Sequence, residues 1–184
     1  FCNGPSPQSV SDNRGLTLPT IYVLNPTCIA KPHTIDQLRT DMNSYAIDIA
    51  ILCETWLKPR HGSGMFAIPG YALFRQGRVC RVGGGIGVYA RSCYLSSVYN
   101  FTYHRADVPF SELLWIRTKV SDSFTLVIGT CYHPPKPRYQ TQDLVNLIIS
   151  DIEPIVMHDA QSVLIFAGDL NGLDCRFLEI PMLV

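Results

Sequence analysis

Two apolar runs in this chain each end at an acidic residue. The first, Ile51-Leu-Cys-Glu-Thr-Trp-Leu57, stops at Glu54. The second, Leu164-Ile-Phe-Ala-Gly-Asp-Leu-Asn171, stops at Asp169, with Asn171 two residues further on. Such runs are typical of strands covered on both faces, as in an α/β sheet. Ligands of these sheets gather at the carboxyl ends of the strands. Two carboxylates and an amide brought together there could hold a hard divalent cation and position water against a phosphate.

The length and composition predict one globular domain. A chain of 184 residues falls in the usual range for a single domain, and its apolar fraction of 47% with a mean hydropathy of +0.12 excludes a disordered protein. Lysine plus arginine equals aspartate plus glutamate at 15 each, so no overall charge indicates a nucleic-acid partner. A local basic patch can still bind phosphate.

The cysteines indicate a reduced, intracellular protein. They are odd in number and include no C-x-x-C pair, which argues against a zinc site or a disulfide framework. No stretch approaches 18 apolar residues, so we expect no membrane segment. The seven are Cys2, Cys28, Cys53, Cys80, Cys93, Cys131 and Cys175.

The order of the expected elements predicts a layered α/β architecture. Residues 1–19 are rich in Pro, Ser, Asn and Gly and are expected to be a disordered lead-in. Thr34-Ile-Asp-Gln37 has the form of a capping box before a helix of about three turns. A second helix begins at Thr141, and Pro154 should end or kink it. Strands are expected at residues 20–24, 47–54, 71–74, 86–90, 113–120, 124–131 and 163–166, with Ser121-Asp-Ser123 as a hairpin turn.

The strand ends carry a series of motifs that resembles a known family. The chain is similar to the endonuclease/exonuclease/phosphatase superfamily and, more narrowly, to the apurinic-type endonuclease domain of non-LTR (LINE-like) retrotransposons. Seven stretches match in family order and cover about residues 20–172. They are Leu24-Asn25, Asp48-Ile-Ala-Ile-Leu-Cys-Glu-Thr-Trp-Leu57, Ile68-Pro-Gly-Tyr71, Gly83-Gly-Gly-Ile-Gly-Val-Tyr89, Glu112-Leu-Leu-Trp115, Cys131-Tyr-His-Pro-Pro135 and Gly168-Asp-Leu-Asn171.

The resemblance implies both a fold and a set of site residues. The fold is a four-layer α/β sandwich of the DNase I-like type, and the cofactor is Mg²⁺ or Mn²⁺. Glu54 would be the direct metal ligand, with Asn25 supporting the metal site. Tyr132 would donate toward the scissile phosphate, and Asp169 and Asn171 would orient and deprotonate the attacking water. These residue types suit that chemistry, since Mg²⁺ prefers carboxylate oxygen and an acid beside water supplies the base.

The end of the chain departs from the family pattern. A late aspartate and a terminal Ser-Asp-His, in which the histidine contacts phosphate, have no counterpart after Asn171. We therefore expect a C-terminally truncated copy, with residues 173–184 as a non-family tail and the second sheet incomplete. Impaired catalysis and poor solubility follow from that expectation, because unpaired strand edges aggregate.

Several residues have a plainer interpretation as well. Without the other motifs, Glu54 would be interpreted as a solvent-exposed acid. Asn25 and Asp169-Leu-Asn171 would be turn residues, and Tyr132 would be a core residue whose hydroxyl reaches solvent. His133 is expected at the surface or behind the site, and both tryptophans, Trp56 and Trp115, in the core. Three arginines precede the glycine run Gly83-Gly-Gly85. They either bind DNA phosphates or lie on a solvent-exposed loop; they are Arg75, Arg78 and Arg81.

The leading hypothesis is Mg²⁺-dependent hydrolysis of DNA phosphodiesters. The resemblance implies a DNA-nicking domain of a longer polyprotein that includes a reverse transcriptase, acting in the nucleus without a small-molecule cofactor. One alternative is a catalytically inactive remnant with at most weak metal or nucleic-acid binding. Another is a phosphoesterase of the same superfamily that acts on phosphoinositide or sphingolipid headgroups.

Overall fold

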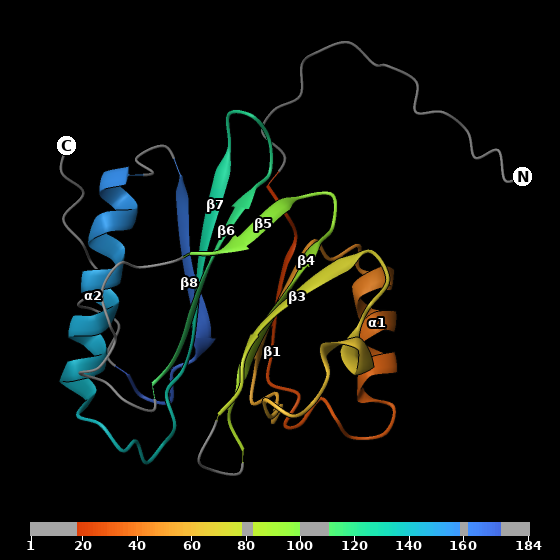
Figure 1. The fold of residues 1–184 in the computed structure, drawn as a ribbon, viewed down its shortest axis with the longest axis horizontal. Coiled ribbons are helices and arrows are strands. Elements are labelled where there is room, and N and C mark those ends of the chain that lie inside the picture. The colour runs from red at the N-terminus through yellow and green to blue at the C-terminus, as the bar shows by residue number, and fades with distance from the viewer. Residues whose placement is uncertain (1–17, 79–82, 100–110, 159–161, 174–184) are drawn as a thin grey trace, which may run out of the picture.

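The computed structural model describes residues 18–78, 83–99, 111–158 and 162–173. Two four-stranded sheets face each other, with one helix on the outer side of each (Figure 1). The first sheet has the order β1-β2-β4-β3 and the second β5-β6-β7-β8. The elements are β1 (Ile21–Leu24), α1 (Thr34–Ser44), β2 (Ile49–Cys53), the 3₁₀ helix η1 (Ser63–Phe66), β3 (Tyr71–Gln76), β4 (Ile86–Arg91), β5 (Leu95–Val98), β6 (Glu112–Lys119), β7 (Thr125–Tyr132), α2 (Thr141–His158) and β8 (Val163–Asp169).

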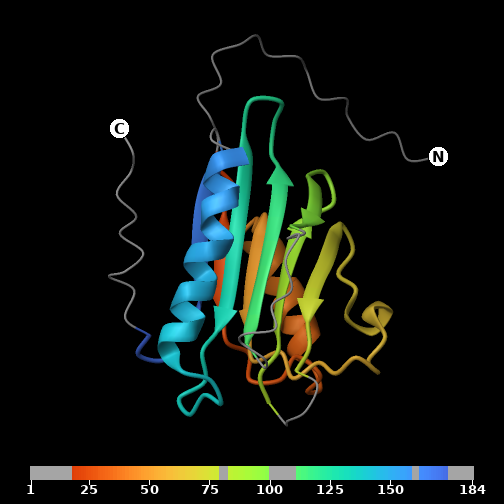
Figure 2. The same ribbon diagram turned by 60° about the vertical axis from the view of Figure 1, so that its left-hand side comes forward.

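Three apolar interfaces separate the four layers. The outer face of the second sheet packs on α2, which runs along the strands (Figure 2). The inner faces of the two sheets pack on each other, and α1 covers the outer face of the first sheet. Alternation along β6 shows the arrangement: Trp115 faces α2, while its neighbours Leu114 and Ile116 face the first sheet. The expected four-layer α/β sandwich is confirmed.

The two acid-bearing strands differ in burial. Every residue of β2 is buried, as predicted for a strand covered on both faces. β8 is only partly buried along its length, so the same prediction is wrong for the second run. Among the described residues β8 pairs with β7 alone, which leaves it at the edge of its sheet.

The predicted hairpin is confirmed. β6 and β7 pair antiparallel from Glu112↔Tyr132 to Lys119↔Thr125, and the turn between them is closed by hydrogen bonds of Val120 and Ser121 N–H to the Phe124 carbonyl. Strand β5, Leu95-Ser-Ser-Val98, was not predicted. It is mostly exposed and has only two apolar residues, so it lacks the pattern that identifies a buried strand.

Both helices lie where the sequence predicts them, but their ends differ. His33 is the N-cap of α1, has a left-handed backbone (φ 65°) and makes no side-chain capping bond. The predicted capping box is therefore wrong: Thr34 is already helical, and the Gln37 amide donates to Asp41 at 2.7 Å instead. Pro154 does not end α2, which continues to His158. Neither helix of the described segments is apolar and long enough to span a membrane.

The strand directions determine where the polar residues gather. β1 and β2 are parallel in one sheet, and β7 and β8 are parallel in the other. Strands β2 and β8 are among the neighbours across the two sheets. The residues that follow these four strands are therefore placed at a common end of the sandwich.

Candidate functional site

Glu54 leaves the end of β2 with an unusual backbone. Its φ is 54°, in the left-handed region that non-glycine residues rarely adopt, and Trp56 has a φ of 56°. Backbone N–H groups of Thr55 and Trp56 donate to the carbonyls of Gly85 and Gly84, at 3.0 and 2.8 Å. These bonds hold the segment in that conformation, so the Glu54 side chain turns toward the second sheet rather than along the strand.

A side-chain amide joins the two acid-bearing strand ends. Asn25 Nδ2 donates to Glu54 Oε1 at 3.2 Å and to Asp169 Oδ2 at 2.9 Å. Asn25 Oδ1 meanwhile accepts from the backbone N–H of Thr27 at 3.1 Å, as in an Asx turn. Asn25 is thus a turn residue whose side-chain nitrogen also hydrogen-bonds both carboxylates, Glu54 and Asp169.

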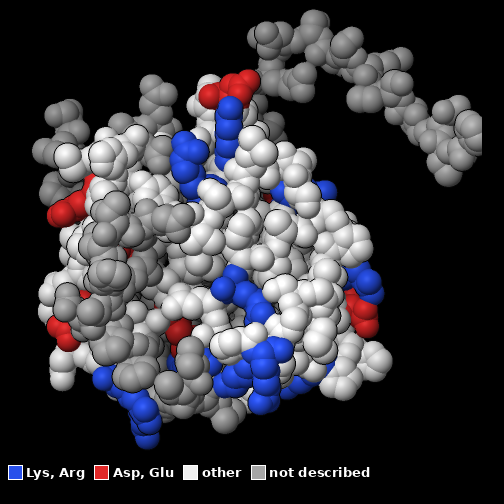
Figure 3. Space-filling view, in the orientation of Figure 1, with Lys and Arg blue, Asp and Glu red and all other residues white. Residues whose placement is uncertain are grey.

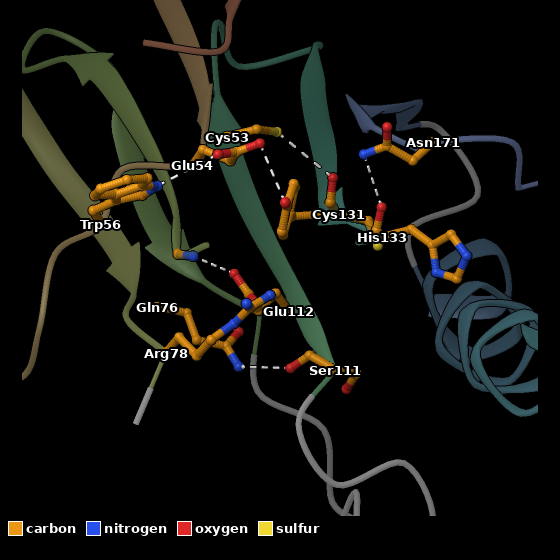
Figure 4. Close-up of polar contacts among 12 residues, drawn as sticks. Cys53, Glu54, Trp56, Gln76, Arg78, Ser111, Glu112, Cys131, His133 and Asn171 are labelled. Atoms are coloured by element: carbon orange, nitrogen blue, oxygen red, sulfur yellow. Dashed lines mark hydrogen bonds and ion pairs between the residues drawn. The ribbon is translucent and has the colours of Figure 1, made fainter. Parts of the chain in front are cut away.

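Two further donors fix the Glu54 carboxylate. The Tyr132 hydroxyl donates to Oε1 at 3.2 Å, and the Trp56 indole N–H donates to Oε2 at 3.4 Å (Figure 4). Burial, and then the charge of Glu54, raise the pKa of Tyr132 to about 12. The hydroxyl is therefore a proton donor at neutral pH. Trp56 is half-buried beside the carboxylate and is no simple core anchor, whereas Trp115 is buried in the core as expected.

A buried thiol lies beneath the two acids. Cys53 accepts a hydrogen bond from Asp169 N–H at 3.2 Å and donates to the carbonyl of Cys131 at 3.6 Å. Burial raises the pKa of Cys53 to about 11, so the thiol keeps its proton. Gly168 pairs with Cys131 within the second sheet, and a Cβ there would lie 2.0 Å from the Cys131 carbonyl oxygen, so the close approach of the two strands requires glycine.

The β7–β8 connection positions Asp169 and Asn171. The backbone N–H of His133 donates to the Asp169 carbonyl at 2.9 Å, and Asn171 Nδ2 donates to the His133 carbonyl at 3.0 Å (Figure 4). Asn171 has a left-handed φ of 39°, which asparagine tolerates better than most residues. His133 is only 5% exposed and its Nδ1 lies 3.0 Å from the Tyr139 hydroxyl, so it is not at the surface.

A buried ion pair adjoins the site, and sequence reasoning assigned it no role. Glu112, at the start of β6, is 3% exposed; one carboxylate oxygen pairs with the Arg78 guanidinium and the other accepts from Gly85 N–H. Burial raises the pKa of Glu112, and the charge of Arg78 opposes that rise. Arg78 also lies over the Tyr132 ring, 5.4 Å from its centroid. The Glu112-Leu-Leu-Trp115 match was the available signal.

The three arginines proposed to bind DNA differ in placement. Arg75 donates to Ser63 Oγ and to the carbonyls of Lys58 and His61, bonds that attach the loop before η1 to β3. Arg78 forms the ion pair described above. Arg81 lies outside the described residues. DNA binding by these residues stays a prediction.

The donor set fits a hard metal ion. Glu54 and Asp169 offer carboxylate oxygens, and Mg²⁺ is commonly held by one or two carboxylates with water completing its shell. No group of three or more His, Cys, Asp or Glu suited to a metal occurs in the described ranges, which argues against a closed zinc-type cage there. Asn25 supports these carboxylates through its N–H, since its oxygen already accepts from Thr27.

Several solved structures have a similar fold. Similar structures include D. rerio TDP2 complexed with a single-strand DNA product (TM-score 0.57, 19% identity, 86% of this chain and 63% of that one) and an AP endonuclease from Archaeoglobus fulgidus (0.55, 17%, 84% and 58%). The human Nocturnin catalytic domain with bound sulfate is a third (0.54, 15%, 83% and 64%).

The likeness is one of fold. No protein-family model matches the sequence, and the search of curated proteins found no significant relative. This chain spans less than two thirds of the length of the similar structures above. Two facing mixed sheets, each covered by a helix, and the agreement over more than four fifths of this chain lead to one conclusion. The chain has the α/β-sandwich fold of the endonuclease/exonuclease/phosphatase type.

Proposed function

We propose that this chain is a metal-dependent phosphodiesterase domain that cleaves DNA. In finer detail, we propose the nicking endonuclease domain of a retrotransposon-derived polyprotein that also carries a reverse transcriptase. One observation carries the proposal: a single amide nitrogen, Asn25 Nδ2, holds Glu54 and Asp169 together at the end of the sandwich. Two carboxylates so placed, beside a protonated tyrosine, suit hydrolysis of a phosphate ester.

Each residue has a distinct part in the proposed reaction. Glu54 holds the metal, which when bound neutralises charge on the phosphate. Tyr132 keeps its proton at neutral pH; its hydroxyl donates to Glu54 Oε1 in the structure and would turn this hydrogen bond to a phosphate oxygen when substrate binds. Asp169 accepts a proton from the attacking water. Asn171 orients that water with its side-chain oxygen, while its nitrogen donates to the His133 carbonyl.

The charge distribution favours a polyanionic substrate. The net charge is zero, but basic residues occur in the loops that follow the carboxyl ends of β1, β2 and β7. Figure 3 shows Lys and Arg side chains toward the lower end of one face. Such residues contact phosphates along a strand without reading its sequence. They are Lys31, Lys58, Arg60, Lys136 and Arg138.

Metal binding is the first test. We expect Mn²⁺ to broaden the NMR signal of the Trp56 indole N–H, which lies 3.4 Å from Glu54 Oε2, more strongly than that of Trp115, whose indole N–H donates to Asp151 on α2. Glu54→Gln should weaken binding at least about tenfold, the range seen even for residues that only support a metal ligand. Glu153→Gln, on exposed α2 surface, is the matched control. Equal Mn²⁺ affinity in all three proteins would refute a metal site at Glu54.

The second test is nicking of supercoiled plasmid in Mg²⁺. Because the sequence lacks a recognisable Ser-Asp-His after Asn171, we expect little activity from this chain alone. A longer protein containing this chain should nick, and Glu54→Ala should reduce the rate at least about a hundredfold. Nicking that survives Glu54→Ala would contradict the assignment.

A non-catalytic protein with weak metal binding is the second candidate. The observation favouring it is that the Glu54 carboxylate already accepts hydrogen bonds from Asn25, Tyr132 and Trp56. It predicts Mn²⁺ binding at Glu54 without nicking by the longer protein. A lipid-headgroup phosphoesterase, the third alternative, would instead hydrolyse a phosphoinositide or sphingomyelin and leave plasmid intact.

A further inference from the structure

Arg78 is enclosed on several sides. Its guanidinium pairs with Glu112, lies 5.4 Å from the centroid of the Tyr132 ring, and packs on Gly84, where an added Cβ would lie 2.5 Å from Arg78 Cζ. The side chain is 13% exposed. An arginine that binds phosphate at a protein surface has its N–H donors exposed to water. The Arg78 guanidinium instead lies between a glycine backbone and an aromatic ring.

Glu112 is anchored at its other oxygen. Gly85 N–H donates to Glu112 Oε2, and the Gly85 carbonyl accepts from the N–H of Thr55, the residue after Glu54. The carboxylate is nearly inaccessible to water, so its position is set by these protein donors rather than by solvent. Glu112 thereby provides a fixed point from which Arg78 is held.

The Tyr132 hydroxyl reaches Glu54 only if its ring is correctly placed. The ring is covered by Arg78 in a cation–π contact, and the hydroxyl donates to Glu54 Oε1 at 3.2 Å. We propose that Arg78, anchored by Glu112, is a positioning residue that sets the Tyr132 hydroxyl on the Glu54 carboxylate. This role rests on the proposed metal site at Glu54, and it differs from a direct grip on DNA.

Arg78→Lys separates position from charge. Lysine keeps the positive charge but loses the planar fork and the flat face that stacks on a ring. If Arg78 acts through geometry, Arg78→Lys should shift the Trp56 indole signal, since Trp56 and Tyr132 share the Glu54 carboxylate, and should weaken Mn²⁺ binding about tenfold. If only charge matters, the lysine variant behaves like the parent protein.

The chain contains a matched control at the opposite end of β2. Arg91 pairs with Asp48 at 2.8 Å and lies 5.4 Å from the centroid of the Tyr71 ring. The Tyr71 hydroxyl, however, donates to the Ile47 carbonyl and not to a carboxylate. Arg91→Lys removes the same kind of fork and stacking, so it should leave the Trp56 signal and the Mn²⁺ affinity unchanged.

A double-mutant cycle tests the route through the tyrosine. Tyr132→Phe removes only the hydroxyl, so Arg78→Lys should add little to the Mn²⁺ affinity loss and to the Trp56 shift in that background. Glu112→Gln, which removes the charge that holds Arg78, should reproduce the Arg78→Lys effect. It provides a second variant if Arg78→Lys does not fold, as judged by its thermal melt.

Each outcome decides between distinct models. The inference is overturned if Arg78→Lys changes neither signal, or if its effect is the same in Tyr132→Phe. A direct phosphate contact predicts a different result. Arg78→Met would then lower the affinity for DNA and reduce the slope of log affinity against log salt concentration by about one, while Arg78→Lys would bind DNA like the parent protein. Failure of the parent protein to bind Mn²⁺ would refute the proposed function alone, because the Trp56 signal reports the position of Glu54 without metal.

Discussion

His133 is a buried imidazole immediately beside Tyr132. Its ring is 5% exposed, with Nδ1 placed 3.0 Å from the Tyr139 hydroxyl. Burial lowers the pKa of His133 below its usual range near 6.5, because desolvation disfavours the charged ring. The neutral ring can accept a hydrogen bond from Tyr139, whose pKa is raised by burial and which therefore keeps its proton.

This burial predicts a pH dependence of stability. The unfolded chain takes up a proton on His133 more readily than the folded one, so its contribution is complete above about pH 6.5 and is lost as pH falls through the lower, folded-state pKa. We expect the melting temperature to drop by a few degrees more in the parent protein than in His133→Gln between pH 7 and pH 5. His158→Gln, on the exposed end of α2, is the control. Parallel pH profiles for all three proteins would contradict the prediction.

Single residues at strand ends could be predicted, but their partners could not. The motif series indicated Asn25, Glu54, Tyr132, Asp169 and Asn171. The structure brings the first four together, whereas the Asn171 amide donates to the His133 carbonyl beside them. The contacts of Glu112 with Arg78 and Gly85 could not be predicted, because they depend on how the two sheets and their loops pack together and not on a local sequence pattern. Trp56 was missed for the same reason: its role follows from a left-handed backbone that only the finished fold imposes.

At the scale of elements, α2 contains a residue that its interior disfavours. Pro154 lies four residues before the end of the helix at His158 and is only half-buried. Proline has no N–H for the carbonyl one turn earlier and costs about 3 kcal/mol in a helix interior. Apolar packing on the second sheet outweighs this cost, since Ile152 and Ile155 on either side are buried.

Pro154→Ala should therefore stabilise the protein. The change restores a helix donor but also releases conformational freedom in the unfolded chain, which offsets about 0.4–1 kcal/mol. We expect a net gain of about 2 kcal/mol in the free energy of unfolding by urea. Ser150→Ala, one turn earlier in the same helix, is the control and should change stability much less. A loss of stability in Pro154→Ala would show that the proline packs favourably.

Most elements were predictable because buried apolar runs have a clear period. The exceptions have physical causes. β5 is exposed and short, so its stability comes from pairing with β6 rather than from an apolar pattern. The capping box failed because the N-cap is His33 and not Thr34, so the residue three positions after the N-cap is Asp36 rather than Gln37. β8 remained partly exposed because, among the described residues, it has a strand neighbour on one side only.

At the scale of the whole molecule, that edge predicts association between chains. Val163 on β8 is 42% exposed, and the backbone groups on the outer side of an edge strand favour pairing with another copy. We expect concentration-dependent association of this chain in sedimentation experiments, reduced by Val163→Lys, since edge lysines oppose strand pairing. Val156→Lys, an equal change at a 50% exposed position on α2, is the control. A monomer at every concentration would contradict the prediction.

The hydrogen bond from Asn25 to Asp169 joins residues 144 positions apart. Glu54 belongs to one half of the sandwich and Asp169 to the other, so a form in which the two halves are separated would lack the proposed cation site. The metal affinity would therefore measure how well the two halves pack together. A substitution that weakens this packing should lower the metal affinity before circular dichroism shows a loss of strand content.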